Sequence, residues 1–403
     1  MKMLFLSHYF PPEGNAPATR TFEHTRRWVK EGHEVTVITC APNVPHGKVY
    51  PGYRNHLFQW RKQSGVNILR VWTLIAANKG TTRRSLNYFS YLISALVAGL
   101  LVRKPDILIA TSPQFFCGCA GALIAKLRRI PFVLEVRDIW PDSIMAVGAM
   151  YHSYTLRWML RAEQWLYRSA TQIVTVGNGY KNILLEKGVE KEKIKVITNG
   201  ADLEQFKMQE TTRERHQKLT CAYVGTIGMA ACLDVVVRAA TRLDQMSEKS
   251  IEFILVGDGA NLEPLKELAA RSKTERIQFK GLLSKKEVQL VLLEADVCLV
   301  HLKKTKLFMT VLPSKLFEAM ASGVPILLGV QGEAEAIVRD SGCGLVFEPE
   351  RDEELCNQLL QLKNNPLDRC QMGFRGRQFV EKHFDRNKLA SLYINLLKQI
   401  IQS

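Results

Sequence analysis

Short apolar segments separated by helix-length stretches run through the first half of this chain, and the same pattern then starts again. Runs of Val, Ile, Leu and Phe bounded by turn residues are typical of strands buried on both faces of a parallel sheet, which the intervening helices cover. In the first half we expect strands at residues 3–7, 35–39, 68–71, 107–110, 132–136, 172–176 and 194–197. In the second half we expect them at residues 220–225, 253–257, 277–279, 297–300 and 326–328. The chain is therefore predicted to be an α/β protein with two Rossmann-like, doubly wound domains that face each other across a cleft.

The length of the chain agrees with two domains, since 403 residues are too many for one ordinary core. The turn-rich stretch Thr198–Asp202 suits a linker between them. We predict an N-terminal domain over residues 1–200 and a C-terminal domain over residues 201–385. A last helix, at about residues 386–403, is a candidate for packing back on the N-terminal domain.

Composition places the chain among soluble globular proteins, with 46% hydrophobic and 23% charged residues. Its nine cysteines form no CxxC pair, which predicts reduced thiols in a cytosolic setting. We expect no signal peptide, because Met1–Leu6 leads directly into a strand-like segment and a polar loop.

Charge is distributed unevenly along the chain. Residues 1–200 hold 27 Lys and Arg against 12 Asp and Glu, whereas the remaining residues hold 28 against 27. A basic half indicates an anionic partner, which is a nucleic acid, an acidic membrane surface or a phosphorylated acceptor. The plainer interpretation is a basic surface that only keeps the protein soluble.

The segment Leu86–Val102 is uncharged over 17 residues and lies between Arg83-Arg84 and Arg103-Lys104. A membrane-spanning helix needs about 20 apolar residues, so a span is the least favoured interpretation. A helix packed in the core is the most favoured. A helix that contacts a membrane surface is the third, since basic flanks and a face with Tyr and Phe suit an interfacial position.

The segment Pro313–Leu328 is the strongest local signal of function, because it predicts a polar loop, an amphipathic helix, a glycine stop and a buried strand. The N–H groups at a helix start carry partial positive charge and attract phosphate. Lys315 adds a full charge there, and Glu318 offers a carboxylate to neighbouring hydroxyls. The segment therefore indicates a nucleotide-sugar pocket. The alternative is an ordinary helix–strand unit with a solvated Lys and Glu.

Taken together, the motifs resemble those of the family 4 glycosyltransferases of the GT-B fold. Within that family the resemblance is closest to the bacterial surface-polysaccharide branch that resembles the fucosamine transferases. The motifs that carry it cover nearly the whole chain and are His8–Gly14, Gly32–Val37, Val136–Asp142, Asn199–Asp202, Tyr223–Gly228, Val256–Gly259 and Pro313–Pro325.

The resemblance implies a metal-independent transfer, with retention, of a sugar from a nucleoside-diphosphate donor that needs no cofactor. It implies a UDP-sugar, with an N-acetylated amino sugar as the transferred group, and a lipid-linked glycan of bacterial surface polysaccharide as the acceptor. The C-terminal domain would hold the donor and the N-terminal domain the acceptor. We therefore expect a cytoplasmic protein, peripheral at the inner face of the cell membrane, with an anionic membrane surface as a partner and no nucleic acid.

The resemblance also implies site residues, at the positions of this sequence that match the motifs of the family. The candidate catalytic residues are Glu318, Asp138 and Arg137, and Glu318 matches the second glutamate of the family's paired-glutamate motif. The candidate donor-binding residues are Gly225, Gly228, Asp258, Gly259, His301, Leu312, Ser314, Lys315, Glu318 and Glu333. The candidate acceptor-binding residues are Gly14, Asn15 and Arg20, and no metal ligand is expected.

Three positions depart from the family pattern. Thr310 stands where the first glutamate of the pair is frequent. The segment 229–232 holds Met, Ala, Ala and Cys where many members carry Arg and Lys, so Lys315 is the candidate for their diphosphate role. Arg137 replaces a frequent histidine before Asp138; a guanidinium can clamp a phosphate or pair with Asp138 but does not shuttle protons.

Two other functions compete with the transferase. A UDP-sugar 2-epimerase shares the two-domain architecture and the donor, but the basic N-terminal half argues against it, because an epimerase needs no membrane partner. A non-catalytic nucleic-acid binder would use the basic half, yet the chain lacks the aromatic and basic strips or the recognition helix expected of one.

Overall fold

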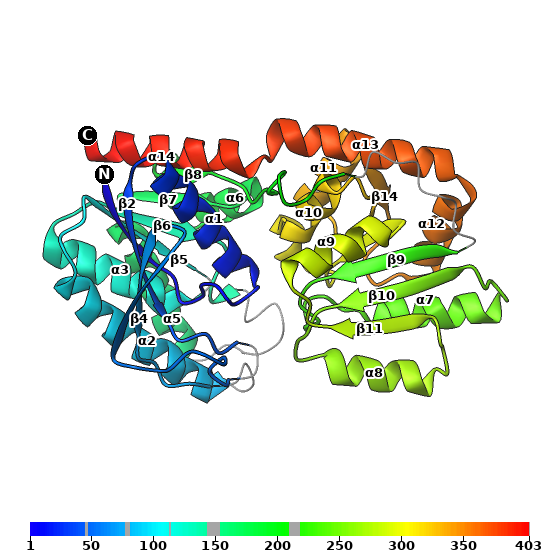
Figure 1. The fold of residues 1–403 in the computed structure, drawn as a ribbon, viewed down its shortest axis with the longest axis horizontal. Helices are drawn as coiled ribbons and strands as arrows, with labels where there is room; N and C mark the ends of the chain where they lie inside the picture. Colours follow the sequence, from blue (N-terminus) through cyan, green and yellow to red (C-terminus); the bar gives the residue numbers. More distant parts are fainter. Residues whose placement is uncertain (45–46, 77–80, 113, 143–153, 209–217, 403) are drawn as a thin grey trace. The chain divides into compact units, whose positions relative to one another are not determined.

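The computed structural model describes residues 1–44, 47–76, 81–112, 114–142, 154–208 and 218–402. Its chain forms two compact units (Figure 1): Met1–Thr198 together with Asn387–Ser403, and Asn199–Arg386. The chain passes into the second unit once and returns through its last helix. The sequence predicts a domain boundary after residue 200, and in the structure the boundary lies between Thr198 and Asn199.

A twisted sheet forms the centre of the first unit. Its strands are β1 (Lys2–Leu6), β2 (Glu34–Cys40), β3 (Phe58–Gln63), β4 (Val66–Val71), β5 (Ile107–Thr111), β6 (Phe132–Val136), β7 (Gln172–Thr175) and β8 (Ile194–Val196). The eight strands lie in the order β3-β4-β2-β1-β5-β6-β7-β8, and β3 is antiparallel to β4 whereas the other neighbours pair in parallel. Every residue of β5 and of β6 is buried, which is why these strands are continuous apolar runs.

β3 was not predicted from the sequence, because it is not an apolar run: most of its side chains are polar and exposed. It returns along β4 through a two-residue turn at Ser64 and Gly65, whose φ angles are 49° and 82°. Positive φ at both positions is typical of a type I′ hairpin turn, whose twist matches that of the flanking strands. The Ser-Gly pair is therefore the sequence signal for this antiparallel edge strand.

Helices cover both faces of this sheet (Figure 1). They are α1 (Ala16–Lys30), α2 (Thr81–Leu101), α3 (Phe115–Arg128), α5 (Tyr154–Ser169), α6 (Asn178–Glu186), the 3-10 helix η1 (Lys191–Lys193) and α14 (Arg386–Gln402). On one face α14 packs against α1: the Trp28 and Tyr393 rings meet edge to face at 5.3 Å, and the Trp28 indole donates to the Ala390 carbonyl at 3.1 Å. On the other face α3 approaches the sheet so closely that a Cβ on Gly121 would lie 2.7 Å from the Cβ of Ala110.

α2 contains all but the last residue of Leu86–Val102, the apolar segment for which the sequence allowed three interpretations. Its inner face buries Tyr91, Ala95 and Ala98, and the Tyr91 hydroxyl donates to the Ile38 carbonyl of β2 at 2.9 Å. Within the ranges that the structure describes, no helix has the length and apolarity needed to cross a membrane.

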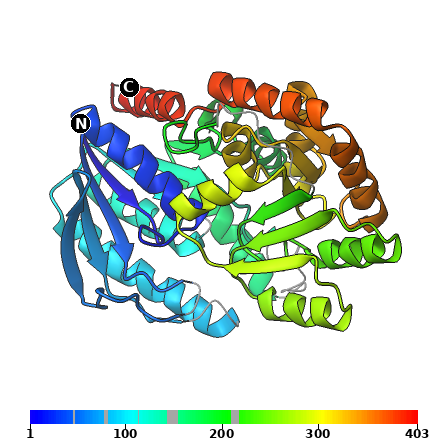
Figure 2. The same cartoon turned by 45° about the vertical axis from the view of Figure 1, so that its right-hand side comes forward.

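A six-stranded sheet forms the centre of the second unit. Its strands are β9 (Leu219–Val224), β10 (Ile251–Val256), β11 (Ile277–Gly281), β12 (Val297–His301), β13 (Ile326–Gly329) and β14 (Gly344–Val346). They pair in parallel in the order β11-β10-β9-β12-β13-β14, and Figure 2 shows β9, β10 and β11 side by side. The order reverses between β9 and β12, and open α/β sheets bind ligands at such a switch point, beyond the carboxyl ends of the strands.

Two helical layers enclose this second sheet in separate apolar clusters. The helices are α7 (Asp234–Gln245), α8 (Leu262–Arg271), α9 (Lys285–Glu294), α10 (Ser314–Ala321), α11 (Glu333–Ser341), α12 (Asp352–Asn364), α13 (Pro366–His383) and the 3-10 helix η2 (Phe308–Thr310). The alternation of parallel strands and helices in both units confirms the predicted pair of Rossmann-like domains.

Candidate functional site

Two glycine loops interlock at the switch point of the second unit, after β9 and β10. The Ile227 amide donates to the Asp258 carbonyl at 3.0 Å. A Cβ on Gly257, whose φ is 138°, would lie 1.8 Å from the Gly225 oxygen, and one on Gly259 would lie 2.4 Å from the Ile227 oxygen. Only glycine permits this approach of backbone to backbone. The loops thus form a surface of bare backbone on which a ligand can lie.

Lys315 reaches over this surface from the first turn of α10. Its ammonium lies 3.5 Å from the centroid of the Tyr223 ring, and a Cβ on Gly225 would come within 2.9 Å of its Nζ. The Tyr223 hydroxyl donates to the Thr226 carbonyl at 2.8 Å, which fixes the ring under the ammonium. This cation–π contact holds the ammonium at the glycine loop and leaves the N–H groups of Lys315 available for hydrogen bonds to a ligand.

The charge of Lys315 is poorly compensated. Among the described residues its ammonium makes no hydrogen bond and no ion pair, and its electrostatic neighbours are Cys298 and Glu318. Burial lowers the pKa of Lys315 to about 7. A half-buried cation without an ion-pair partner is only partly solvated, so this position favours an anionic ligand.

Glu318 lies one turn further along α10. In the described part of the chain its carboxylate accepts no hydrogen bond and forms no ion pair, which leaves its oxygens available to hydroxyl groups of a ligand. Ser314 is the first residue of α10, and no side chain caps that end, since the N-cap is Pro313. The predicted donor residue Leu312 is buried in the core, where only its backbone is placed to meet a ligand.

His301, predicted to bind the donor, lies behind the glycine loop with both ring nitrogens in use. Its Nδ1 lies 2.8 Å from the Ala231 carbonyl, and the Glu350 amide donates to its Nε2 at 2.9 Å. Because Nε2 accepts, Nδ1 carries the proton and donates, and burial lowers the pKa of the ring. This geometry makes His301 a neutral support of the loop. Contact with a donor would have to replace one of these bonds, and it stays a prediction.

The other predicted donor residues border the same loops. Gly228 turns the loop, and its carbonyl accepts from the Ala231 amide at 3.0 Å. The Asp258 carboxylate accepts from the Gly259 amide at 2.6 Å. Glu333 opens α11 directly after Gly332, where a Cβ would lie 2.1 Å from the Met309 oxygen, so η2 is held against this helix start.

Segment 229–232 contains no cation of its own, and the Lys303 amide donates to the Ala230 carbonyl at 2.8 Å. The Cys232 thiol, at a residue with φ of 46°, donates to the Asp234 carboxylate at 3.1 Å and lies 3.2 Å from that of Glu350. No cation of this segment therefore replaces the Arg and Lys that many family members carry there. Lys315 is the cation that the structure places at the glycine loop. The Thr310 hydroxyl donates to the Leu307 carbonyl at 2.7 Å, within its own 3-10 turn.

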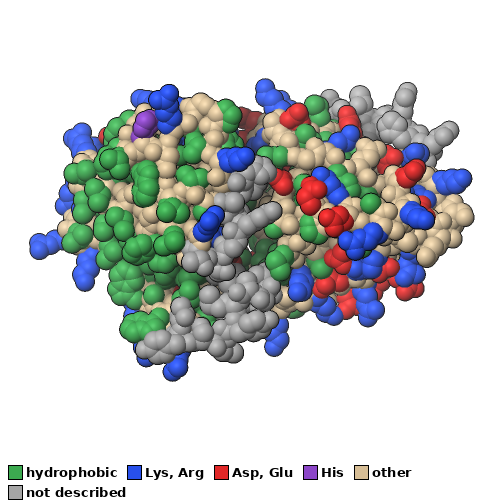
Figure 3. Space-filling model, turned by 90° about the horizontal axis from the view of Figure 1, so that it is seen from below, with side chains coloured by type: hydrophobic (Ala, Val, Ile, Leu, Met, Phe, Trp, Pro, Cys, Tyr) green, Lys and Arg blue, Asp and Glu red, His purple; other side chains and the backbone are tan. Residues whose placement is uncertain are grey.

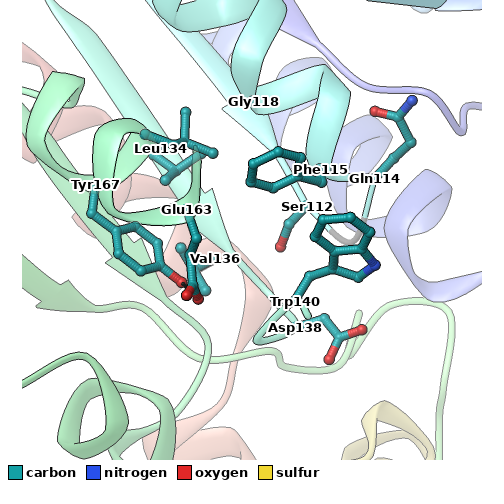
Figure 4. A pocket seen from close by; sticks show the side chains of 11 residues that line it. Ser112, Gln114, Phe115, Gly118, Leu134, Val136, Asp138, Trp140, Glu163 and Tyr167 are labelled. Carbon is teal, nitrogen blue, oxygen red and sulfur yellow. Dashed lines mark hydrogen bonds between the residues drawn. The ribbon is translucent and has the colours of Figure 1, made fainter. Parts of the chain in front are cut away.

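A pocket opens beside β6 in the first unit (Figure 4). Its lining is Ser112, Gln114, Phe115, Gly118, Leu134, Val136, Asp138, Trp140, Glu163, Leu166 and Tyr167. The Phe115 and Trp140 rings stack at 4.7 Å and form one wall, with the Asp138 carboxylate nearby. The cavity has a free volume of about 20 Å³, close to the space of one water molecule, so a larger ligand meets only the side chains at its rim.

The predicted catalytic pair Arg137-Asp138 follows β6 directly, at the carboxyl edge of the sheet. The Arg137 amide donates to the Ser112 hydroxyl at 2.8 Å, which ties this strand end to that of β5. Glu163, opposite Asp138 in the pocket, accepts from Tyr167 at 2.7 Å and pairs with Lys187 at 2.8 Å. Burial raises the pKa of Glu163 in spite of that lysine.

The predicted acceptor residues are of two kinds. Gly14 lies in open space, where a Cβ added to it would have no atom within 4 Å, and Asn15 caps α1 by accepting from the Ala18 amide at 2.9 Å. Arg20 is 4% exposed; it pairs with Glu135 at 3.1 Å and donates to the carbonyls of Ile197 and Thr198. This geometry gives Arg20 a structural role in the core, and its contact with an acceptor stays a prediction.

Sequence reasoning did not single out Tyr223, Phe115, Trp140 or Glu163. Tyr223 and Trp140 fall within motifs that carried the resemblance, and each is an aromatic residue at or just after the end of a strand. That position is a usable signal in a parallel sheet, because side chains there face the ligand edge. Glu163 gave no such signal, since its place in the pocket depends on how α5 packs. No group of three or more His, Cys, Asp or Glu side chains that could hold a metal ion occurs in the described ranges.

Comparison with known families divides the chain as the units do. Residues 18–205 match the family described as Glycosyltransferase Family 4, and residues 204–379 match the one described as Glycosyl transferases group 1.

Relatives and solved structures agree with these matches. The chain is 25% identical to the glycosyl transferase WcaI of Escherichia coli (strain K12), whose name assigns it to colanic acid biosynthesis, over 98% of this chain and 99% of that protein. It is 24% identical to WbjE of Pseudomonas aeruginosa, named as a probable glycosyltransferase, over 77% and 76%.

Two solved structures have a similar fold. Sucrose-phosphate synthase of Thermosynechococcus elongatus has a TM-score of 0.77 at 16% identity, covering 100% of this chain and 99% of that one. Anabaena HepE in complex with UDP and glucose has a TM-score of 0.74 at 16% identity, covering 99% of each chain.

Proposed function

Because the chain is a glycosyltransferase with the GT-B fold, built from a family 4 half and a group 1 half, we propose that it transfers an N-acetylated amino sugar from a UDP-sugar to a lipid-linked glycan. The transfer would proceed with retention and belong to the synthesis of a bacterial surface polysaccharide. It would take place at the inner face of the cell membrane.

One observation carries the donor side of this proposal: the ammonium of Lys315 lies unpaired, among the described residues, against the glycine loop at the switch point. A nucleoside diphosphate supplies the anion that this charge lacks. We propose that Glu318, one turn along the same helix, accepts hydrogen bonds from the ribose hydroxyls. The unencumbered backbone at Gly225 lets phosphate oxygens approach closely.

The chemistry follows from where charge develops. When the bond from the sugar to the diphosphate breaks, negative charge accumulates on the departing UDP. Lys315 and the uncapped N–H groups at the start of α10 stabilise that charge, so we propose that no metal ion is required. In the first unit, Asp138 and Arg137 are the proposed groups that position the acceptor or stabilise its attacking hydroxyl.

Names of similar proteins support the finer parts of the proposal. The solved HepE complex contains UDP and glucose, which favours uridine as the nucleoside of the donor. The name of WcaI refers to colanic acid, which favours a polysaccharide product. The N-acetylated amino sugar rests on the resemblance to the fucosamine-transferase branch alone.

Calorimetric titration of the purified protein with UDP, GDP and ADP tests the donor site. We expect UDP to bind more tightly than GDP or ADP. Lys315→Met should weaken UDP binding about 10- to 150-fold, the loss expected for one hydrogen bond to a charged group. Glu318→Ala should weaken UDP binding and abolish release of UDP from a UDP-sugar.

Glu294→Ala is the matched control, because Glu294 is exposed on α9 of the same unit and has no ion pair within the described residues. Its UDP binding should equal that of the wild type. Absence of binding by all three nucleotides would remove the proposed function. Conversion of a UDP-sugar to its 2-epimer without an acceptor would replace the transferase with an epimerase.

A further inference from the structure

α2 presents an apolar side to solvent as well as to the core. Its outward residues, with their exposed fractions, are Leu86 (52%), Phe89 (49%), Ile93 (49%), Val97 (45%), Leu100 (38%) and Leu101 (72%). They follow the three- and four-residue spacing of one helical face, opposite Tyr91, Ala95 and Ala98. We call these six residues the α2 stripe. A helix on a protein surface normally carries polar residues on this side, so the stripe lacks the solvent-facing half of an amphipathic pattern.

Two further helices of this unit, α3 and α5, also expose apolar side chains. α3, which packs against α2 through the edge-to-face pair Phe89–Phe116, exposes Leu127 at its end. α5 exposes Trp158 and Trp165, and Arg161 lies over the Trp158 ring at 5.5 Å. Trp beside Arg is a combination that suits a boundary between an apolar and an aqueous phase.

Charge around the stripe is predominantly basic. Residues 81–130 contain seven Lys and Arg and one acidic residue, Asp106. Arg83 and Arg84 precede the stripe, and Arg103 and Lys104 follow it. Figure 3 shows hydrophobic side chains gathered over this side of the first unit, whereas acidic and basic side chains are mixed over the second. A surface that is apolar in the middle and basic at its ends complements an anionic bilayer.

A run of aromatic rings joins the stripe to the pocket of the first unit. Phe89 meets Phe116 at 6.0 Å, Phe116 meets Phe115 at 5.8 Å, and Phe115 stacks on Trp140 at 4.7 Å. A lipid-linked acceptor has to contact both the bilayer and Asp138. These rings connect the two places within the first unit. The position of the stripe therefore agrees with a lipid-linked substrate.

We propose that the α2 stripe is the surface by which this protein docks on a bilayer of anionic phospholipid. α2 lies in the plane of the interface, with its apolar side chains among the acyl chains and its basic ends on the headgroups. The inference rests on the proposed function only for the identity of the acceptor, because docking itself needs neither donor nor acceptor.

Sedimentation of the full-length protein with vesicles tests this proposal. We expect binding to vesicles that mix phosphatidylcholine with phosphatidylglycerol, weak binding to phosphatidylcholine alone, and loss of binding at high salt. The triple variant Leu86→Gln, Ile93→Gln and Val97→Gln should bind mixed vesicles at least about tenfold more weakly. Arg103→Gln with Lys104→Gln should lose about tenfold on mixed vesicles and little on phosphatidylcholine.

Matched controls come from the second unit. Met246, Leu282 and Leu290 are exposed to similar extents, and their replacement by Gln should leave vesicle binding unchanged. Calorimetry with UDP on the stripe variant verifies that the protein is folded. The same titration on the wild type separates the two proposals, because a wild type that binds UDP but not vesicles overturns docking alone.

Two results would overturn the docking surface. One is vesicle binding by the stripe variant equal to that of the wild type. The other is a wild type that does not bind vesicles and is a dimer in light scattering, while the stripe variant is a monomer. The stripe would then be the contact surface between two copies of the chain.

Discussion

The two units share a sheet order and differ in their surfaces. Starting from the first strand of each, both contain neighbours in the order 3-2-1-4-5-6, if the antiparallel edge strand β3 is left out of the count. Yet the first half of the chain has an excess of 15 basic residues and an exposed apolar helix, whereas the second has an excess of one and a surface tied by ion pairs such as Arg242–Asp352. One architecture thus carries two different surfaces, and the difference lies in side chains rather than in topology.

The pairing of charges separates the units further. In the first unit Arg20 pairs with Glu135, and Lys187 pairs with Glu163 and Asp142. In the second unit Lys315 has no counter-ion among the described residues. Removing one partner of a buried pair leaves a charge uncompensated in the core, whereas an unpaired charge is a candidate ligand contact. This contrast predicts which substitutions destabilise the fold and which weaken only the proposed donor site.

The largest effect is expected from Glu135→Ala in the first unit. Glu135 is fully buried and accepts from Arg20 and from the Thr111 hydroxyl at 2.9 Å. Its removal leaves the guanidinium in the core without a counter-ion, which should lower the free energy of unfolding by about 3–5 kcal/mol. All six tryptophans lie in residues 1–200, so urea unfolding followed by tryptophan fluorescence reports on this unit.

Binding of UDP, measured without urea, should be unchanged in the same variant. Glu294→Ala should alter neither signal. An unfolding midpoint equal to that of the wild type would mean that the pair Arg20–Glu135 does not stabilise the first unit, and the contrast between the units would fail.

The second prediction compares two glycines. Gly257→Ala in the second unit places a carbon 1.8 Å from the Gly225 oxygen at a positive φ, at a cost of about 1–3 kcal/mol. The loop beneath Lys315 must shift, so UDP affinity should fall at least about tenfold. Gly14→Ala in the first unit meets no atom within 4 Å and should stay within about 0.5 kcal/mol of the wild type.

Calorimetry with UDP measures the first variant, and tryptophan fluorescence during urea unfolding measures the second. Full UDP affinity in Gly257→Ala would show that the interlocked loops do not carry the donor. A large loss of stability in Gly14→Ala would contradict the open space around that residue.

The parallel strands could be predicted from sequence because each is an apolar run, and that property depends on neighbouring residues alone. β3 could not be found in this way, since an edge strand exposes polar side chains and is identified only by its Ser-Gly turn. The glycines at the strand ends were also predictable. Their interlocking was not, because it depends on which loop lies against Gly257.

The roles of His301 and Arg20 illustrate the same limit. Each has a residue type and a position that suit ligand binding, but its side chain is hydrogen-bonded to backbone groups far away in the sequence. His301 bonds to Ala231 and Glu350, and Arg20 bonds to Ile197 and Thr198. Contacts between residues so far apart in the chain leave no local pattern. Lys315 and Glu318 were predictable as a pair because one short helix carries both.

The smallest effect should be a dependence of donor affinity on pH. The pKa of Lys315 is about 7 in the unliganded protein, because burial outweighs the influence of Cys298 and Glu318. A bound diphosphate stabilises the ammonium and raises this pKa, so the protein takes up a proton on binding wherever the free lysine is neutral. Affinity should therefore be nearly constant below roughly pH 6 and should fall by about tenfold between roughly pH 6 and pH 8.

UDP-N-acetylglucosamine is the suitable probe, because its diphosphate, unlike that of UDP, has no group that titrates in this range. Calorimetry in two buffers of different ionisation enthalpy counts the protons taken up. Lys315→Met should bind weakly, with no uptake and no dependence on pH. The same pH dependence in this variant would assign the titration to another group, and Lys315 would then differ from the paired cations of the first unit only in its position.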